Sequence, residues 1–145
     1  PDGRQAVILV ADASVIVKWL IQDPEKEADT ARAERLMESV ASGEQRVLQP
    51  CHWIAEVAAV LARTSAETAV DDVAMLCALE LPIAEEMSIL PRACELSVEL
   101  NQHVFDTYYH AVALEIPEAI LVTADERYLR AARAKGRIIP LRDWQ

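Results

Sequence analysis

The sequence predicts an α/β fold in which helices cover both faces of a parallel sheet. Short apolar segments alternate with longer segments that carry apolar residues at helical spacing, and this alternation is typical of strand–helix–strand units. The first apolar segment, residues 6–11, has no polar residue on either face, as expected for a central strand covered on both sides. The 145 residues suit a single domain, 1–145, behind a short polar lead at residues 1–5.

Four further segments are predicted to be short strands. They are residues 46–49, 81–84, 119–122 and 137–141. The second of these contains Pro82, which a sheet tolerates at its edge. We therefore expect the segment at 81–84 to be an edge strand.

Seven segments are predicted to be helical, and several carry a residue that favours a helix end. Ser14 suits the cap of the first helix, Pro24 suits the first position of the second, and Gly43 ends the second. The third has its apolar residues on one helical stripe. The predicted helices are residues 14–21, 24–40, 51–63, 66–79, 88–100, 106–116 and 125–134.

The composition excludes several classes of protein. The glycines at positions 3, 43 and 136 are too scattered to form a P-loop or a dinucleotide-binding turn. Three cysteines without a C-x-x-C pair predict reduced, mostly buried thiols and argue against zinc. No apolar run approaches the roughly 18 residues of a membrane span, and the N-terminus lacks a signal-peptide pattern. A cytoplasmic protein without membrane association is expected.

The charge of the chain is unevenly distributed. The formal net charge of -10 by itself disfavours nucleic-acid binding, because phosphate contacts require Lys and Arg. Residues 127–142, however, carry six basic residues and no acid. This basic run is either a solvated helix face with cations near its C-terminus or a surface that binds an anionic partner.

Four acidic residues stand where an apolar element ends or where its buried stripe meets water. They are Asp12, Glu56, Asp106 and Asp125. Asp12 directly follows the first predicted strand, and Asp125 follows the strand at 119–122 after two residues. Because chemistry in open parallel sheets takes place at the carboxyl ends of the strands, these acids are candidates for a functional site.

Each acid also has a structural explanation. Asp12 and Asp125 could cap helices, and Thr123 begins a sequence with capping-box spacing. Asp106 could favour the positive end of a helix dipole. Glu56 lies at the border of an apolar helix stripe, where a charged residue is ordinary. These separate structural explanations do not predict that all four acids come together at one site.

Mutual repulsion of the acids predicts a cation. If the strands before Asp12 and Asp125 are neighbours, their carboxylates stand roughly 5 to 10 Å apart, because adjacent strands are about 4.8 Å apart. Two carboxylates about 4 Å apart repel by on the order of 4 kcal/mol at an effective dielectric of 20, which raises their pKa values unless a cation intervenes. Oxygen ligands without a cysteine or histidine pair favour Mg²⁺ or Mn²⁺.

Four short motifs contain these acids. They are V-A-D-A-S at residues 10–14, E-V-A-A-V-L at 56–61, F-D-T-Y-Y at 105–109 and V-T-A-D at 122–125. Their order and spacing resemble those of PIN-domain nucleases, and most closely toxins of the VapC type, over residues 6–141. The resemblance implies a three-layer α/β/α fold with five parallel strands in the order 3-2-1-4-5. It also implies a magnesium-dependent endoribonuclease, a homodimer, an RNA substrate and a cognate antitoxin.

The resemblance further implies residue roles. All four acids would be catalytic metal ligands, with Glu56 binding directly or through water. Ser14 and Thr123 would orient the ligands or their waters. The cation would activate a water for in-line attack on the phosphodiester, which leaves a 5′ phosphate. No Ser-His-Asp or Cys-His arrangement indicates a side-chain nucleophile.

Four residues are weaker candidates for contact with RNA. Arg127 and Arg130 begin the basic run and could hold phosphates. Tyr109 is expected in the core and pocket wall, with stacking against a base as the alternative. His110, one turn after Asp106, is expected to be packed or partly exposed, with a bond to Asp106 or substrate as the alternative.

Other functions compete with a toxin ribonuclease. One is a PIN-domain nuclease of RNA processing outside a toxin–antitoxin pair, and another is a non-catalytic PIN-like interaction module. A third is a phosphatase that forms an aspartyl-phosphate. Such phosphatases need a second acid two residues after the first, where this chain has Ser14.

Overall fold

Four parallel strands form one sheet in the computed structural model, which describes residues 7–21 and 29–145. The strands are β1 (Ile8–Ala11), β2 (Arg46–Val47), β3 (Ala119–Thr123) and β4 (Ile138–Pro140). They lie in the order β2-β1-β3-β4, and each neighbouring pair is parallel. The predicted α/β class with a parallel sheet is confirmed.

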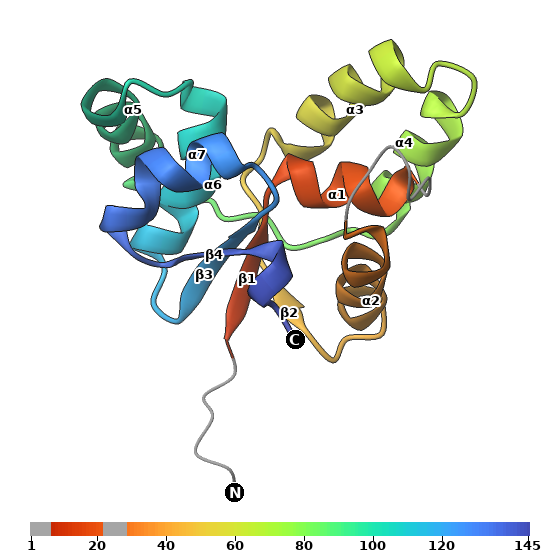
Figure 1. The fold of residues 1–145 in the computed structure, drawn as a ribbon, viewed down its shortest axis with the longest axis horizontal. Coiled ribbons are helices and arrows are strands. Elements are labelled where there is room, and N and C mark those ends of the chain that lie inside the picture. The colour runs from red at the N-terminus through yellow and green to blue at the C-terminus, as the bar shows by residue number, and fades with distance from the viewer. Residues whose placement is uncertain (1–6, 22–28) are drawn as a thin grey trace, which may run out of the picture.

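Helices cover the sheet on both sides (Figure 1). In the described part of the chain they are α1 (Ala13–Leu20), α2 (Thr30–Ala41), α3 (Trp53–Thr64), α4 (Ala69–Ala78), α5 (Ile89–Leu100), α6 (Val104–Glu115) and α7 (Glu126–Ala132), with 3₁₀ turns at Arg133–Lys135 and Leu141–Asp143. Figure 1 shows α5, α6 and α7 on one side and α1 to α4 on the other. None of these helices is both long and apolar enough to cross a membrane. The predicted helix start at Pro24 lies outside the described residues.

The fifth strand expected at residues 81–84 is reduced to a single bridge. Ile83 pairs in parallel with Gln49, just beyond β2, so this segment lies at the edge where the order 3-2-1-4-5 places it. The Pro82 carbonyl accepts from Gln49 N at 2.9 Å, but proline has no N–H to continue a ladder. The sheet therefore has four strands instead of the five expected.

A glutamine side chain fixes the end of β1. Gln49 is fully buried. Its amide oxygen accepts from Ala11 N at 2.8 Å, and its amide nitrogen donates to the Ala11 carbonyl at 2.9 Å. The side chain thus supplies the pair of hydrogen bonds that a neighbouring strand would supply. Because Ala11 directly precedes Asp12, this amide fixes the point at which the first acid leaves the sheet.

The core fills the space between the sheet and both helix layers. Leu9, Val10 and Ala11 of β1 are buried, as predicted for a central strand covered on both faces. Trp53 of α3 and Tyr109 of α6 are among the largest fully buried side chains. The helices that carry Glu56 and Asp106 are therefore anchored by aromatic residues in their first turns or close to them.

The cysteines differ from the expectation in one respect. Cys51, Cys77 and Cys94 are free, in agreement with the absence of a C-x-x-C pair, but all three are exposed. The prediction of mostly buried thiols is wrong. Cys77 and Cys94 lie on outward faces of α4 and α5, where a small side chain is tolerated without packing.

Candidate active site

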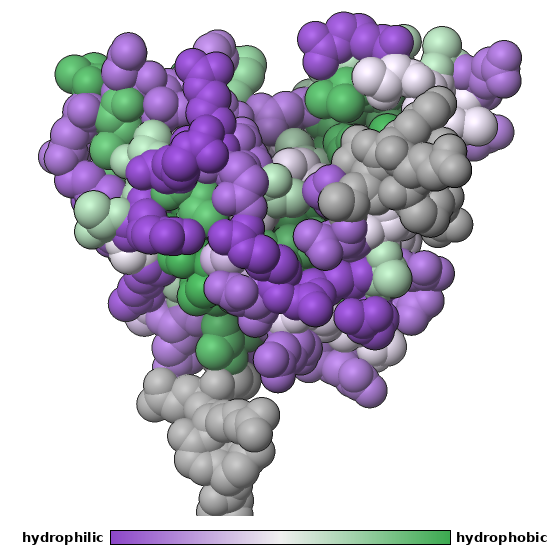
Figure 2. Space-filling model, viewed as in Figure 1, coloured by the Kyte–Doolittle hydropathy of each residue, from purple (hydrophilic) through white to green (hydrophobic). Residues whose placement is uncertain are grey.

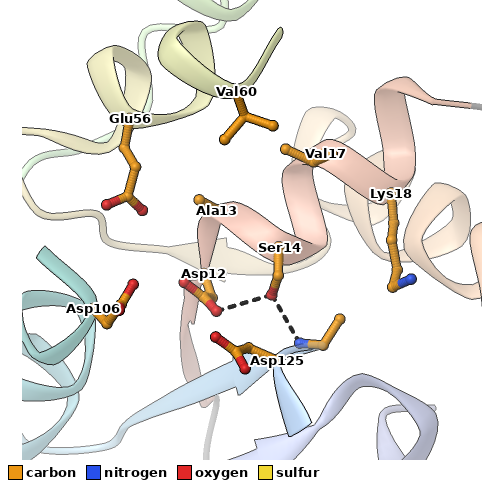
Figure 3. A pocket seen from close by; sticks show the side chains of 10 residues that line it. Asp12, Ala13, Ser14, Val17, Lys18, Glu56, Val60, Asp106 and Asp125 are labelled. Carbon is orange, nitrogen blue, oxygen red and sulfur yellow. Dashed lines mark hydrogen bonds between the residues drawn. The ribbon is translucent and has the colours of Figure 1, made fainter. Parts of the chain in front are cut away.

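The four predicted acids line one open cavity of about 420 Å³. Asp12 follows β1, Glu56 and Asp106 lie in the first turns of α3 and α6, and Asp125 precedes α7. Figure 3 shows the four carboxylates around the same space. Figure 2 shows that the molecule is hollowed between the two helix groups, above the sheet. The fold brings together acids that are far apart in sequence.

Asp12 is held by two hydroxyl groups. Ser14 Oγ and Thr123 Oγ1 both donate to Asp12 Oδ2, at 2.9 and 2.7 Å. Each hydroxyl also accepts a backbone N–H: Ala124 N donates to Ser14 Oγ at 2.9 Å, and Asp125 N donates to Thr123 Oγ1 at 3.0 Å. The loop after β3 therefore fixes the orientation of the carboxylate, and its other oxygen faces the cavity (Figure 3).

Of the helix caps that could explain Asp12, Thr123 and Asp125, only the cap at Asp125 is formed. The side chain of Asp12, at the N-cap of α1, makes no capping hydrogen bond. At α7 the N-cap is Asp125, whose Oδ1 accepts from Tyr128 N at 3.0 Å. The capping-box prediction for Thr123 is therefore wrong. Its hydroxyl lies at the end of β3, next to β1, and bonds Asp12 instead.

Burial and mutual repulsion perturb the acids. Burial raises the pKa of Asp12 from 3.8 to about 7; the hydrogen bonds from Thr123 and Ser14 lower it, and the charges of Asp106 and Glu56 raise it further. Burial, followed by the charges of Glu56 and Asp125, also raises the pKa of Asp106. Desolvation therefore contributes more than the repulsion expected from the sequence. Without a cation, Asp12 is partly protonated near pH 7.

An aromatic wall lies beside Glu56. His52 Nε2 is 3.7 Å from Glu56 Oε2, and the His52 ring stacks on Tyr108 with centroids 4.7 Å apart. His52 Nε2 also lies 2.9 Å from the Phe105 carbonyl. Since a carbonyl only accepts, this ring nitrogen carries the proton. The spacing of four residues between His52 and Glu56 places both on the same helix face.

The donor set of the cavity fits a hard divalent cation. Its ligand atoms are carboxylate oxygens, with the hydroxyl of Ser14 beside them and Lys18 as the basic residue of the lining. Within residues 7–21 and 29–145, no three Asp, Glu, His or Cys side chains are placed to hold one ion without moving. The cavity thus has the oxygen ligands and the negative charge that a divalent cation requires. The acidic side chains must move closer together before they can coordinate one ion.

Comparison with known families assigns the fold. The PIN domain matches residues 9–134, a range that includes all four acids. The chain belongs to the PIN domain family. PIN domains are generally nucleases and typically use divalent metal ions, so membership indicates a phosphodiester hydrolase. No curated protein matches the chain.

Tyr109 of the PIN domain packs against the ring of His52, the residue whose Nε2 lies 3.7 Å from Glu56. It is 0% exposed, as expected for a core residue, and it is not among the residues that line the cavity, so the alternative of stacking on a base is wrong. Its hydroxyl makes no hydrogen bond of ordinary geometry to any described residue, although a side-chain hydrogen-bond interaction with Glu56 is among the causes that raise its pKa. Burial, followed by the charges of Glu56 and Asp12, raises the pKa of Tyr109. The hydroxyl therefore stays protonated and can act as a donor.

His110 bonds to groups away from the acids of the PIN domain. Its Nε2 lies 2.8 Å from the Gly136 carbonyl, and its Nδ1 lies 2.9 Å from Tyr128 Oη. The carbonyl only accepts, so Nε2 donates and Nδ1 accepts from the tyrosine. Burial lowers the pKa of His110, which keeps the ring neutral. The expected packed histidine is confirmed, and the alternative of a bond to Asp106 or substrate is wrong.

Half of the basic run is used in contacts within the PIN domain. Arg142 and Lys135 each form an ion pair with a glutamate, and Arg137 donates to backbone carbonyls around the end of α6. Arg127 and Arg130 on α7 are exposed and form no ion pair with any described residue. Of the basic run, the part next to Asp125 is thus available to an anionic partner.

Proposed function

We propose that this PIN domain is a magnesium-dependent endoribonuclease and the toxin of a toxin–antitoxin pair, with Mn²⁺ able to replace Mg²⁺. The observation that carries the proposal is the convergence of Asp12, Glu56, Asp106 and Asp125 on one open cavity. Their motifs resemble those of VapC-type toxins, which supports the toxin role. RNA, a second copy of the chain and an antitoxin are the proposed partners.

The residues of the chain have distinct tasks in this proposal. The four carboxylates bind the cation, which polarises the phosphate and lowers the pKa of a water. Ser14 and Thr123 orient Asp12 through two hydrogen bonds to one of its oxygens. Lys18, at the edge of the cavity, attracts the RNA backbone. In-line hydrolysis leaves a 3′ hydroxyl and a 5′ phosphate.

Exposed apolar side chains support the proposal that the chain binds other protein molecules. They include Val70 (80%) and Met75 (39%) on α4, Met87 (92%) just before α5, and Leu90 (53%) and Val98 (80%) on α5. The residues on α4 and those around α5 lie on opposite sides of the sheet (Figure 1), and exposed apolar surface is a common feature of protein–protein interfaces. They are consistent with a homodimer or with a bound antitoxin.

Cleavage assays on three substrates test the proposal. The purified chain is incubated with structured RNA, DNA of the same sequence and a small phosphate monoester, in Mg²⁺, in Mn²⁺ or in excess EDTA. We expect internal cleavage of RNA, with 5′-phosphate products, in either cation and none in EDTA. Cleavage of the monoester alone would support the aspartyl-phosphate phosphatase. A chain that cuts nothing and binds no Mn²⁺ by calorimetry would be a non-catalytic module.

The exposed arginines of α7 are expected to bind RNA phosphates. Replacing both Arg127 and Arg130 with Ala should weaken RNA binding and leave kcat unchanged. For single strands each lost phosphate contact flattens the dependence of log K on log salt by about 0.7, so the double variant should flatten it by about 1.4. Arg142→Ala is the matched control, because Arg142 is already paired with Glu126. Equal salt slopes in the double variant and the control would show that α7 does not contact RNA.

A further inference from the structure

Two buried polar atoms without hydrogen-bond partners lie together beside Glu56. Within the described residues they are Tyr109 Oη and His52 Nδ1. Their rings are in contact, with centroids 4.9 Å apart, and His52 Nε2 is 3.7 Å from Glu56 Oε2. Buried polar groups are nearly always bonded, so two unbonded atoms in the wall of a site indicate an interaction that forms in another state of that site.

The chemistry of the two atoms limits what they can bond. His52 Nε2 donates to the Phe105 carbonyl, which leaves Nδ1 as an acceptor. The Tyr109 hydroxyl carries its proton and is a donor. Among the carboxylates that raise the pKa of this hydroxyl, Glu56 acts most strongly by its charge, and it alone also acts through a side-chain hydrogen-bond interaction. An acceptor for Tyr109 is therefore close at hand.

Glu56 on α3 lacks the hydrogen bonds that hold the carboxylates of Asp12 and Asp125 in place. Asp12 accepts two hydroxyl hydrogen bonds and Asp125 accepts one backbone hydrogen bond. Glu56 has His52 Nε2 at 3.7 Å and interacts with the Tyr109 hydroxyl, but no described residue gives its carboxylate a hydrogen bond of ordinary geometry. Figure 3 shows its side chain reaching from α3 toward the space between Asp12 and Asp106. A long flexible carboxylate in this position needs a fixed donor if it is to bind a cation at one angle.

We infer that Tyr109 is a positioning residue that donates its buried hydroxyl to the Glu56 carboxylate when the four acids close on a divalent cation. The inference rests on the proposed function, since it requires Glu56 to act in cation binding. Tyr109 is fully buried, so it acts through Glu56 and does not touch RNA. His52 forms the other side of the same wall and limits the angles open to the carboxylate.

Tyr109→Phe removes the hydroxyl alone and tests the inference. Supporting hydrogen bonds to metal ligands typically change metal affinity by about 10-fold or more, and we expect that loss in Mn²⁺ affinity by calorimetry. The kcat for RNA should fall while KM for RNA stays unchanged. In the metal-free protein the buried hydroxyl makes no hydrogen bond of ordinary geometry, so the Tm of the variant should equal or exceed that of wild type. A residue that only supports the fold would lower Tm and would not separate kcat from KM.

Tyr108→Phe is the matched control on the same helix. The Tyr108 hydroxyl lies 3.5 Å from Cys51 Sγ and outside the acid cavity, so its removal should leave Mn²⁺ affinity and kcat at wild-type values. Wild-type Mn²⁺ affinity and kcat in Tyr109→Phe would overturn the inference alone. A wild-type protein that neither binds Mn²⁺ nor cuts RNA would overturn the proposed function and the inference with it.

Discussion

Asp12→Asn is expected to abolish RNA cleavage and, at the same time, to stabilise the metal-free protein. Loss of one metal ligand removes several kcal/mol of transition-state stabilisation, which corresponds to a rate decrease of about 10³-fold or more. The fold should persist, because the amide oxygen of Asn can accept the same hydrogen bonds from Ser14 and Thr123 that Oδ2 of Asp12 accepts.

The gain in stability follows from the pKa of Asp12. Burial raises this pKa from 3.8 to about 7, so at pH 8 wild type must hold an ionised carboxylate in an unfavourable environment. Asn carries no charge there. A shift of about three pKa units corresponds to on the order of 4 kcal/mol, and we expect the variant to recover a large part of it at pH 8. Denaturant unfolding in EDTA measures the difference.

Asp143→Asn is the control for this prediction. Asp143 is exposed in the last 3₁₀ turn and is not part of the cavity lining, so its replacement should change neither cleavage nor stability. If Asp12→Asn cut RNA at the wild-type rate, the carboxylates would not form the reaction centre. If it were less stable than wild type at pH 8, the hydrogen bonds to the charged carboxylate would outweigh desolvation.

The meeting of Asp12 and Asp125 could be predicted because strand geometry is local and regular. Ile8 to Ala11 pair in parallel with Ala119 to Val122 in register, so residues that follow both strands reach the same edge of the sheet. Periodicity also placed Glu56 at the border of an apolar helix stripe and Asp106 at a helix start. The sequence was therefore sufficient to predict the type of each of these elements and the position of each acid along it.

Other features depend on tertiary packing that no local pattern reports. The Thr123 hydroxyl and Asp12 are 111 positions apart in the chain, and no local rule favours that bond over a capping box. The Gln49 amide that completes β1 is a second case. His110 shows the limit for helices: spacing tells which residues share a face with Asp106, but it does not tell toward which neighbours that face packs.

The metal-free PIN domain is expected to lose stability as pH rises through about 7, and Mn²⁺ is expected to reverse this loss. The folded state holds the Asp12 proton up to a pKa of about 7, whereas the unfolded state releases it near 3.8. Between these values the folded state binds more protons, so its stability falls with rising pH. The raised pKa of Asp106 acts in the same direction.

His110 changes the pH dependence of stability in the opposite direction. Its contribution cancels when the stability of Asp12→Asn is subtracted from that of wild type. Its pKa is lowered from 6.5, so its contribution is present above pH 6.5 and is lost as pH falls through the folded value. Wild type and Asp12→Asn share this histidine. The free energy of unfolding of wild type minus that of Asp12→Asn should therefore isolate Asp12, and it should fall steadily between pH 4 and pH 8.

Proton release on cation binding is a second measure of the raised pKa of Asp12. A carboxylate must lose its proton before it can bind a metal ion, so Mn²⁺ binding at pH 6 should release about one proton from Asp12, and binding at pH 8 should release almost none. Calorimetry in buffers of different ionisation enthalpy counts that proton. The rise in Tm on adding Mn²⁺ should accordingly be larger at pH 8 than at pH 5.5. Equal rises at both pH values, with no proton released at pH 6, would mean that the cation binds away from Asp12, because no ligand with a raised pKa would then be involved.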